Sequence, residues 1–209
     1  MKYKYLLFDL DGTLIDTNKL IIDSFKYTLK LHIDIDIEEG QIKKYFGEPL
    51  ITTLKRFSEK KAEEMYDTYI KFNESIHDKS IKAFKNVDSV LMKLYKKSYS
   101  LSVVTSKRKV LAKRGLEICN LLRYFDKVVA YEDTNLHKPY PDPIIKALSL
   151  LRADPEQALM VGDSEYDINC ARNAGVKSVF VNWSEAGFYQ ENIRSDFVID
   201  EFPHLLDIV

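Results

Sequence analysis

The stretch YLLFDLDGTLIDT, residues 5–17, decides the fold of this chain. Its apolar run ends in two aspartates, Asp9 and Asp11, which one residue separates and which Gly12 follows at once. Taken alone, the pair is typical of a turn, of a helix cap or of a metal site. A calcium-binding loop is excluded, because the glycine is the fourth residue instead of the sixth and the twelfth is Leu20 instead of glutamate.

The composition is that of an ordinary globular protein. The chain has 209 residues, 45% of them hydrophobic and 30% charged, with a formal net charge of −1. This balance gives no overall field that would attract nucleic acid or an anionic membrane. The two cysteines are too few for a disulfide scaffold, and no stretch approaches 18 consecutive apolar residues. We therefore expect a cytoplasmic protein, a monomer or weak dimer, with no nucleic-acid or membrane partner.

Short apolar runs recur along the chain and alternate with segments of helical length. Several of these runs lack polar alternation, as is typical of strands that are buried on both faces. Strands are expected at residues 3–8, 99–104, 127–131, 158–162, 178–182 and 196–200, and helices within 88–97, 142–151 and 167–175. The alternation predicts an α/β fold with a parallel sheet.

Residues 17–82 break this alternation. Apolar residues recur there at helical spacing, in one set at Ile21, Phe25 and Leu29 and in another at Ala62, Met65, Tyr66, Tyr69 and Ile76. We therefore expect residues 17–82 to form an all-helical cap domain, and residues 1–16 and 83–209 to form the α/β core.

Polar residues follow the expected strands, at the edge of a parallel sheet where ligands bind. They are the carboxylates Asp9, Asp11, Asp163 and Asp167, the hydroxyl pair Thr105 and Ser106, and Lys138. Four carboxylates at one edge would repel one another, and burying an unpaired charge is costly. A divalent cation would remove this difficulty, and an all-oxygen ligand set favours Mg²⁺.

This set of groups also suits a phosphate ester. An anionic carboxylate approaches an anionic phosphate only with positive charge between them, which a metal ion and Lys138 would supply. Hydrolysis of phosphate monoesters is among the slowest uncatalysed reactions known, so catalysis must come mainly from electrostatics, positioning and a covalent route.

Four motifs, taken together and in order, resemble those of the haloacid dehalogenase superfamily, on its phosphatase side. They are DLDGT (9–13), VVTSK (103–107), KPYPDP (138–143) and GDSEYD (162–167). The resemblance covers essentially the whole chain, and the helical insertion is similar to the cap of the small-cap subgroup. It implies a Rossmann-like, doubly wound parallel sheet with an inserted helical cap.

The resemblance also implies roles for the motif residues. Asp9 would be the nucleophile that forms an aspartyl-phosphate, and Asp11 would protonate the leaving oxygen and then activate water. Mg²⁺ would be held by the Asp9 carboxylate, the Asp11 backbone carbonyl and Asp163, with support from Asp167. Phosphate would be bound by Gly12, Thr105, Ser106 and Lys138.

Within the superfamily, the chain is similar to phosphoglycolate phosphatases and to bacterial inorganic pyrophosphatases of this fold. The stretches YFGEPL (45–50) and EQALMVGDS (156–164) favour the pyrophosphatase group. Gly47 would then belong to a cap loop that faces the substrate, although an ordinary loop residue is an equal alternative. The expected substrate is a small phosphorylated metabolite or pyrophosphate.

Other readings stay open at this stage. Lys138 alone is typical of a solvated lysine, Asp163 and Asp167 of helix-cap charges, and Thr105 of a strand-end hydroxyl, but these readings do not explain their common order. A sugar-phosphate mutase would use the same covalent step, and a phospho-receiver module would use similar residues without turnover. His137 has no partner at ligand spacing and is expected to be exposed, and the tyrosines of the cap are expected to be core residues.

Overall fold

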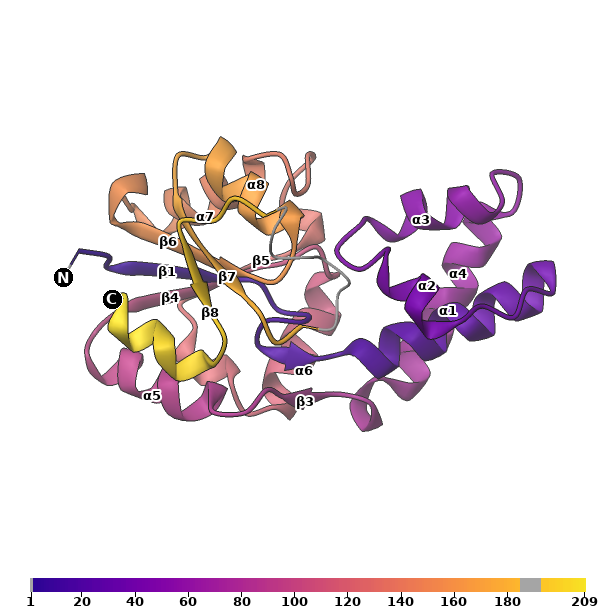
Figure 1. Ribbon diagram of the computed structural model, residues 1–209, viewed down its shortest axis with the longest axis horizontal. Helices are drawn as coiled ribbons and strands as arrows, with labels where there is room; N and C mark the ends of the chain where they lie inside the picture. Colours follow the sequence, from indigo (N-terminus) through magenta and orange to yellow (C-terminus); the bar gives the residue numbers. More distant parts are fainter. Residues whose placement is uncertain (1, 185–192) are drawn as a thin grey trace.

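The structure is a computed structural model that describes residues 2–184 and 193–209. It consists of an α/β core and a helical cap that lies beside one edge of the core (Figure 1). The carboxyl ends of the central strands point toward the cap (Figure 1). None of the described helices combines the length and the apolar character needed to cross a membrane.

A six-stranded sheet forms the centre of the core, with the strand order β5-β4-β1-β6-β7-β8. All five neighbouring pairs are parallel. The strands are β1 (Tyr5–Phe8), β4 (Ser100–Val104), β5 (Lys127–Val129), β6 (Ala158–Gly162), β7 (Lys177–Val181) and β8 (Phe197–Ile199). The expected α/β fold with a parallel sheet is confirmed, and every expected strand is found within three residues of its predicted ends.

The sheet is covered by helices on both faces. One face packs on α5 (Val87–Lys96), α6 (Lys109–Ile118) and the C-terminal η6 (Phe202–Asp207), and the other on α7 (Asp142–Leu151) and α8 (Glu165–Asn173). Short 3₁₀ turns complete the connections: η2 (Leu122–Tyr124), η3 (Tyr131–Asp133) and η4 (Pro155–Gln157). The chain adds β4 and β5 on one side of β1 and β6, β7 and β8 on the other. The carboxyl end of β1 therefore lies at the switch point where doubly wound sheets bind ligands.

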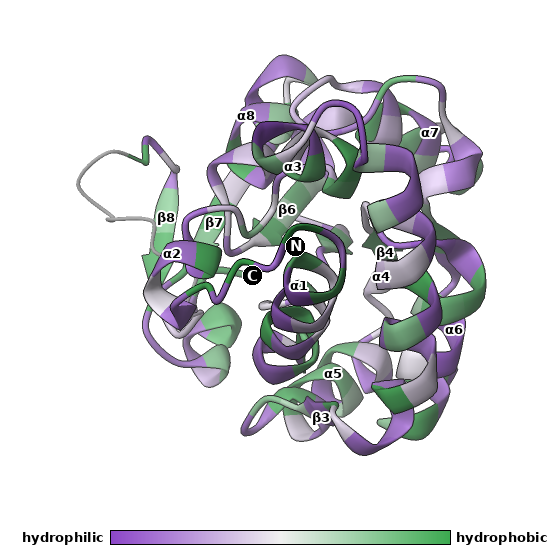
Figure 2. Ribbon diagram, turned by 90° about the vertical axis from the view of Figure 1, so that its right-hand side faces the viewer, coloured by the Kyte–Doolittle hydropathy of each residue, from purple (hydrophilic) through white to green (hydrophobic). Residues whose placement is uncertain are grey.

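The cap is built from four helices, α1 (Asn18–Ile33), α2 (Glu39–Lys43), α3 (Leu50–Phe57) and α4 (Ala62–Ile76). It has its own apolar core, in which Phe25 of α1 meets Tyr69 of α4 edge to face, with ring centroids 5.0 Å apart. In Figure 2, α1 and α4 change between hydrophilic and hydrophobic colours along their length, as expected for helices with one buried face. The periodicity predicted α1 and α4 but not the shorter α2 and α3.

The cap joins the core through two crossing points that lie side by side. The outgoing chain forms β2 (Ile15–Asp16), and the returning chain passes η1 (His77–Lys79) and forms β3 (Lys82–Ala83). The two strands pair antiparallel, with Ile15 opposite Ala83 and Asp16 opposite Lys82. We propose this pair as the boundary between cap and core, which is where the sequence pattern places it.

Candidate active site

Asp9 is held in a nearly buried position at the carboxyl end of β1. Its backbone N–H donates to the carbonyl of Val161 in β6, at 2.9 Å. The chain then turns sharply at Gly12, whose φ of +85° is a left-handed conformation that favours glycine. A Cβ at this position would also collide with the carboxylate of Asp163. Glycine therefore lets the turn close directly against the second acidic loop.

Lys138 lies between two of the carboxylates. Its Nζ is 2.7 Å from Oδ1 of Asp9 and 2.5 Å from Oδ1 of Asp167, and all three side chains are buried. Burial alone would lower the pKa of Lys138, but the two carboxylates outweigh this effect and raise its pKa above the ordinary value. The lysine is therefore a fixed positive charge beside the carboxylate of Asp9.

The loop after β6 supplies Asp163 and Asp167. Ser164 caps α8 and exchanges hydrogen bonds with Asp167: the backbone N–H of Ser164 donates to Asp167 Oδ2, and the backbone N–H of Asp167 donates to Ser164 Oγ. Asp163 accepts hydrogen bonds from the hydroxyls of Ser184, at 2.6 Å, and Thr13, at 3.4 Å. These two hydroxyl groups, which orient Asp163, were not anticipated from the sequence.

Asp9, Asp163 and Asp167 form an acidic cluster that fits a divalent cation. Each offers one carboxylate oxygen, and these oxygens all lie within 4.8 Å of one another. Burial raises the pKa of Asp9 and, with the charge of Asp167, raises the pKa of Asp163 to about 7. Three buried carboxylates against the single ammonium of Lys138 leave a deficit of positive charge, and hard oxygen donors suit Mg²⁺.

The Asp11 carboxylate is not part of this cluster. It is bonded instead by Lys107, whose Nζ lies 2.9 Å from Oδ1 and 3.2 Å from Oδ2. The expected coordination of a cation by the Asp11 backbone carbonyl stays a prediction. Lys107 is a site residue that sequence reasoning missed, although it is the last residue of the quoted motif VVTSK.

Thr105 is fixed at the carboxyl end of β4. Its backbone N–H donates to the carbonyl of Val129, at 2.9 Å, and its Oγ1 accepts the backbone N–H of Lys107, at 3.1 Å. Thr105 and Ser106 line the same chamber as Lys138 and the acidic residues. The structure therefore brings the residues predicted from the four motifs around one space.

That space is a chamber of about 220 Å³ between core and cap. The cap loop around Gly47 forms part of its wall, and Gly47 has φ +81°. A Cβ there would lie 3.0 Å from Cβ of Ser164 and 3.1 Å from the ring of Tyr166. The loop thus touches the core beside the acidic cluster, where a larger residue would hold it away.

Two expectations about aromatic residues need correction. His137 was expected to be exposed, but it is half-buried and stacks on Tyr131, with ring centroids 4.0 Å apart. Tyr69 belongs to the core of the cap, as expected, but it also lines the chamber with Tyr45 and Tyr66. The spacing of apolar residues could not show that these tyrosines line the chamber, because a helix of the cap has one face toward its own core and another toward the site.

A parallel α/β sheet with carboxylates, hydroxyls and a buried lysine at its carboxyl edge, covered by a helical cap, defines the class of capped phosphohydrolases. A family model for haloacid dehalogenase-like hydrolases matches residues 6–181. The chain belongs to this family.

Full-length relatives support the same assignment. The chain is 50% identical, over all of its length and 96% of the relative, to a protein of Caldanaerobacter subterraneus provisionally named pyrophosphatase PpaX. It is 39% identical, over all of its length and 97% of the relative, to pyrophosphatase PpaX of Bacillus cereus. A solved structure from Clostridium acetobutylicum, described as a phosphatase from its sequence, has 30% identity and a TM-score of 0.89, covering 100% of this chain and 98% of that one. The protein is thus an enzyme, a phosphatase or pyrophosphatase of this family.

Proposed function

We propose that the protein is a Mg²⁺-dependent phosphohydrolase that works through an aspartyl-phosphate on Asp9. The observation that carries this proposal is the position of Asp9: it is bonded by Lys138 and lies within the acidic cluster. The ammonium of Lys138 beside this carboxylate would attract a phosphate, and the chamber gives that phosphate room to bind. Bound Mg²⁺ would neutralise the charge that gathers between Asp9, Asp163 and the phosphoryl group.

The first step transfers the phosphoryl group to Asp9. A carboxylate oxygen of Asp9 attacks phosphorus, the bond from phosphorus to the leaving oxygen breaks, and the leaving oxygen takes the electron pair and a proton from Asp11. The hydroxyl of Thr105 donates a hydrogen bond to a phosphoryl oxygen, and Lys138 holds the carboxylate of Asp9 in position.

The second step returns the enzyme to its starting state. Water attacks phosphorus, Asp11 accepts the proton of that water, and the bond from phosphorus to Asp9 breaks to release phosphate. In a mutase, an alcohol group of the substrate would replace water in this step. Phosphate release and isomerisation therefore separate the two functions.

Pyrophosphate is the first substrate to test, and phosphoglycolate-like monoesters are the second. The support for pyrophosphate is that full-length relatives, at 50% and 39% identity, bear the name pyrophosphatase. Both kinds of substrate are small enough to be enclosed by a cap that touches the core at Gly47.

The test is a phosphate-release assay with Mg²⁺ on pyrophosphate, 2-phosphoglycolate, glucose 1-phosphate and p-nitrophenyl phosphate. We expect turnover of at least one of them and loss of turnover in Asp9→Asn. Acid-quenched protein should carry label from a ³²P-labelled substrate in the wild type and none in Asp9→Asn. Ordinary turnover by Asp9→Asn would exclude the covalent route, and isomerisation without phosphate release would assign a mutase.

A further inference from the structure

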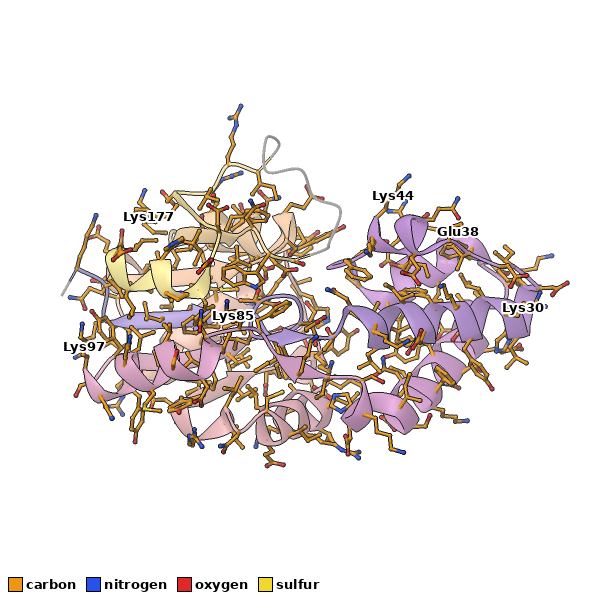
Figure 3. The ribbon with its side chains drawn as sticks, turned by 60° about the horizontal axis from the view of Figure 1, so that its bottom comes forward. Lys30, Glu38, Lys44, Lys85, Lys97 and Lys177 are labelled. Carbon is orange, nitrogen blue, oxygen red and sulfur yellow. The ribbon has the colours of Figure 1, made fainter. Side chains whose placement is uncertain are left out.

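The cap supplies no positive charge to the chamber among the residues that the structure describes. Its lining residues are aromatic, aliphatic or neutral and polar, apart from one carboxylate, Glu48. Arg56 of the cap is bonded to Glu48 at 2.6 Å and does not line the chamber. Lys30 and Lys44 lie on the outside of the cap (Figure 3). A charged leaving group must therefore find its counter-charge on the core.

The core contributes three side chains of lysine or arginine to the described lining: Lys107, Arg108 and Lys138. Lys138 is enclosed between Asp9 and Asp167, on the side of the transferred phosphoryl group. Arg108 is 42% exposed and pairs with Glu74 of the cap at 3.2 Å. Lys107 is only 11% exposed, so it is the cation best shielded from solvent on the remaining side of the chamber.

The backbone of Lys107 is fixed at both ends of the residue. Its N–H donates to Oγ1 of Thr105, and its carbonyl accepts the N–H of Tyr131 at 3.1 Å. Two contacts of Nζ reach the carboxylate of Asp11. An ammonium group has three donors, so Lys107 retains one for another acceptor.

This position fixes what Lys107 would meet during the reaction. In the proposed function, Asp11 gives its proton to the leaving oxygen, so the leaving group lies within hydrogen-bond reach of Asp11. The ammonium of Lys107, which is bonded to Asp11, then lies beside the rest of the leaving group, which is attached to that oxygen. For pyrophosphate this is the second phosphate, and for phosphoglycolate it is the methylene carboxylate.

We propose that Lys107 is a specificity-determining residue that receives an anionic leaving group and selects substrates that carry one. The inference rests on the proposed role of Asp11 and adds the substrate class: esters and anhydrides of phosphate whose leaving group bears a negative charge.

The test compares Lys107→Met with a matched control, Lys109→Met. Lys109 stands two residues away and also pairs with an aspartate, Asp133 at 2.6 Å, but it does not line the chamber. Each variant is assayed on two pairs of substrates: 2-phosphoglycolate against its uncharged analogue 2-hydroxyethyl phosphate, and pyrophosphate against phenyl phosphate. The readout is the ratio of kcat/KM within each pair, from which a partly unfolded fraction of the variant cancels.

In Lys107→Met we expect kcat/KM for the charged member of a pair to fall about 10- to 100-fold further than for the uncharged member, as for the loss of one charge-assisted hydrogen bond. Lys107→Arg should restore part of the ratio, and Lys109→Met should leave it at the wild-type value. A shift in the pyrophosphate pair identifies a phosphate as the leaving group, and a shift in the phosphoglycolate pair a carboxylate.

Equal losses on both members of each pair, or no loss, would overturn the inference, because Lys107 would then serve only Asp11 or the fold. That result differs from failure of the proposed function, in which the wild type and Lys109→Met would release phosphate from none of the four substrates.

Discussion

Lys138 and Asp9 form an ion pair of 2.7 Å in which both side chains are almost fully withdrawn from solvent. Removal of the ammonium would leave Asp9, Asp163 and Asp167 as close carboxylates without a compensating charge. We expect Lys138→Met to abolish turnover and to lower the free energy of unfolding by about 3 kcal/mol in the presence of EDTA, the cost of breaking a buried pair. Urea unfolding of the wild type and of the variant measures this difference in the free energy of unfolding.

The control for that variant is Lys177→Met, which breaks an exposed pair with Asp196. Its cost should be at most about 1 kcal/mol. Equal losses of unfolding free energy in the two variants would show that the ion pair at the active site stabilises the folded protein no more than an exposed ion pair does.

Mg²⁺ should stabilise the folded protein through the acidic cluster. Binding to the native state alone adds about 2.7 kcal/mol at a hundred times Kd. We expect Mg²⁺ to raise Tm of the wild type and of Asp133→Asn, whose carboxylate lies outside the cluster, but not of Asp163→Asn. Thermal unfolding with and without Mg²⁺ makes the comparison, and an undiminished rise in Asp163→Asn would argue against this cation site.

Gly47→Ala should impair catalysis as well as lower stability. The residue would be forced into a left-handed conformation, which costs roughly 1–2 kcal/mol, and its Cβ would press on Ser164 and Tyr166. We expect kcat/KM to fall roughly 10-fold as the cap loop moves away from the core.

Gly40→Ala is the matched control in the same cap. Gly40 lies in α2, and an added Cβ would meet nothing within 4 Å. That variant should keep its activity and gain about 0.5–1 kcal/mol of stability. If Gly47→Ala is as active as Gly40→Ala, the loop does not need its contact with the core for turnover.

His77, at the junction of cap and core, should make the protein sensitive to mild acid. Burial lowers its pKa below the ordinary value of 6.5, although a hydrogen bond with Asp78 opposes this. The unfolded chain therefore takes up a proton more readily than the folded one below pH 6.5. The folded protein keeps its full stability above pH 6.5, where His77 is neutral in both states. It loses stability as the pH falls from 6.5 toward the lowered pKa of the folded state.

The variant His77→Gln tests this dependence. Its loss of Tm between pH 7.5 and pH 5 should be smaller than that of the wild type, whereas His204→Gln, at an exposed position, should follow the wild type. Parallel curves for His77→Gln and the wild type would contradict the assignment.

The parts of the fold that could be predicted are those with strong local patterns. The buried strands are short runs of Val, Leu and Phe, and α1 and α4 keep an apolar period over four turns. Helix α6 was not anticipated, because its segment KVLAKRGLEI is interrupted by Gly115 and carries four charges. A Cβ added at this glycine would lie 3.5–3.7 Å from side-chain atoms of Ile15, Ile81 and His77, so α6 is held there by a tertiary contact that the local pattern does not show.

The candidate site could be predicted where residues follow strands in order, and not where single side chains arrive from elsewhere. Ser184 bonds Asp163 from beyond the next strand, and nothing in its surroundings marks it. Lys107 was visible in a motif, but its bond to Asp11 spans 96 positions. Such contacts depend on the register of the sheet and on the path of each loop, which only the folded chain fixes.

The pairing of β2 with β3 has a consequence for how such a protein can change over time. Because the chain leaves and re-enters the core at neighbouring points, the core requires only that the two ends of the insert meet. The entropy of closing a loop grows slowly with its length, so an insert of a different size or shape costs the core little. The catalytic core and the cap can therefore diverge separately, so that a different cap can replace this one while the catalytic residues of the core stay unchanged.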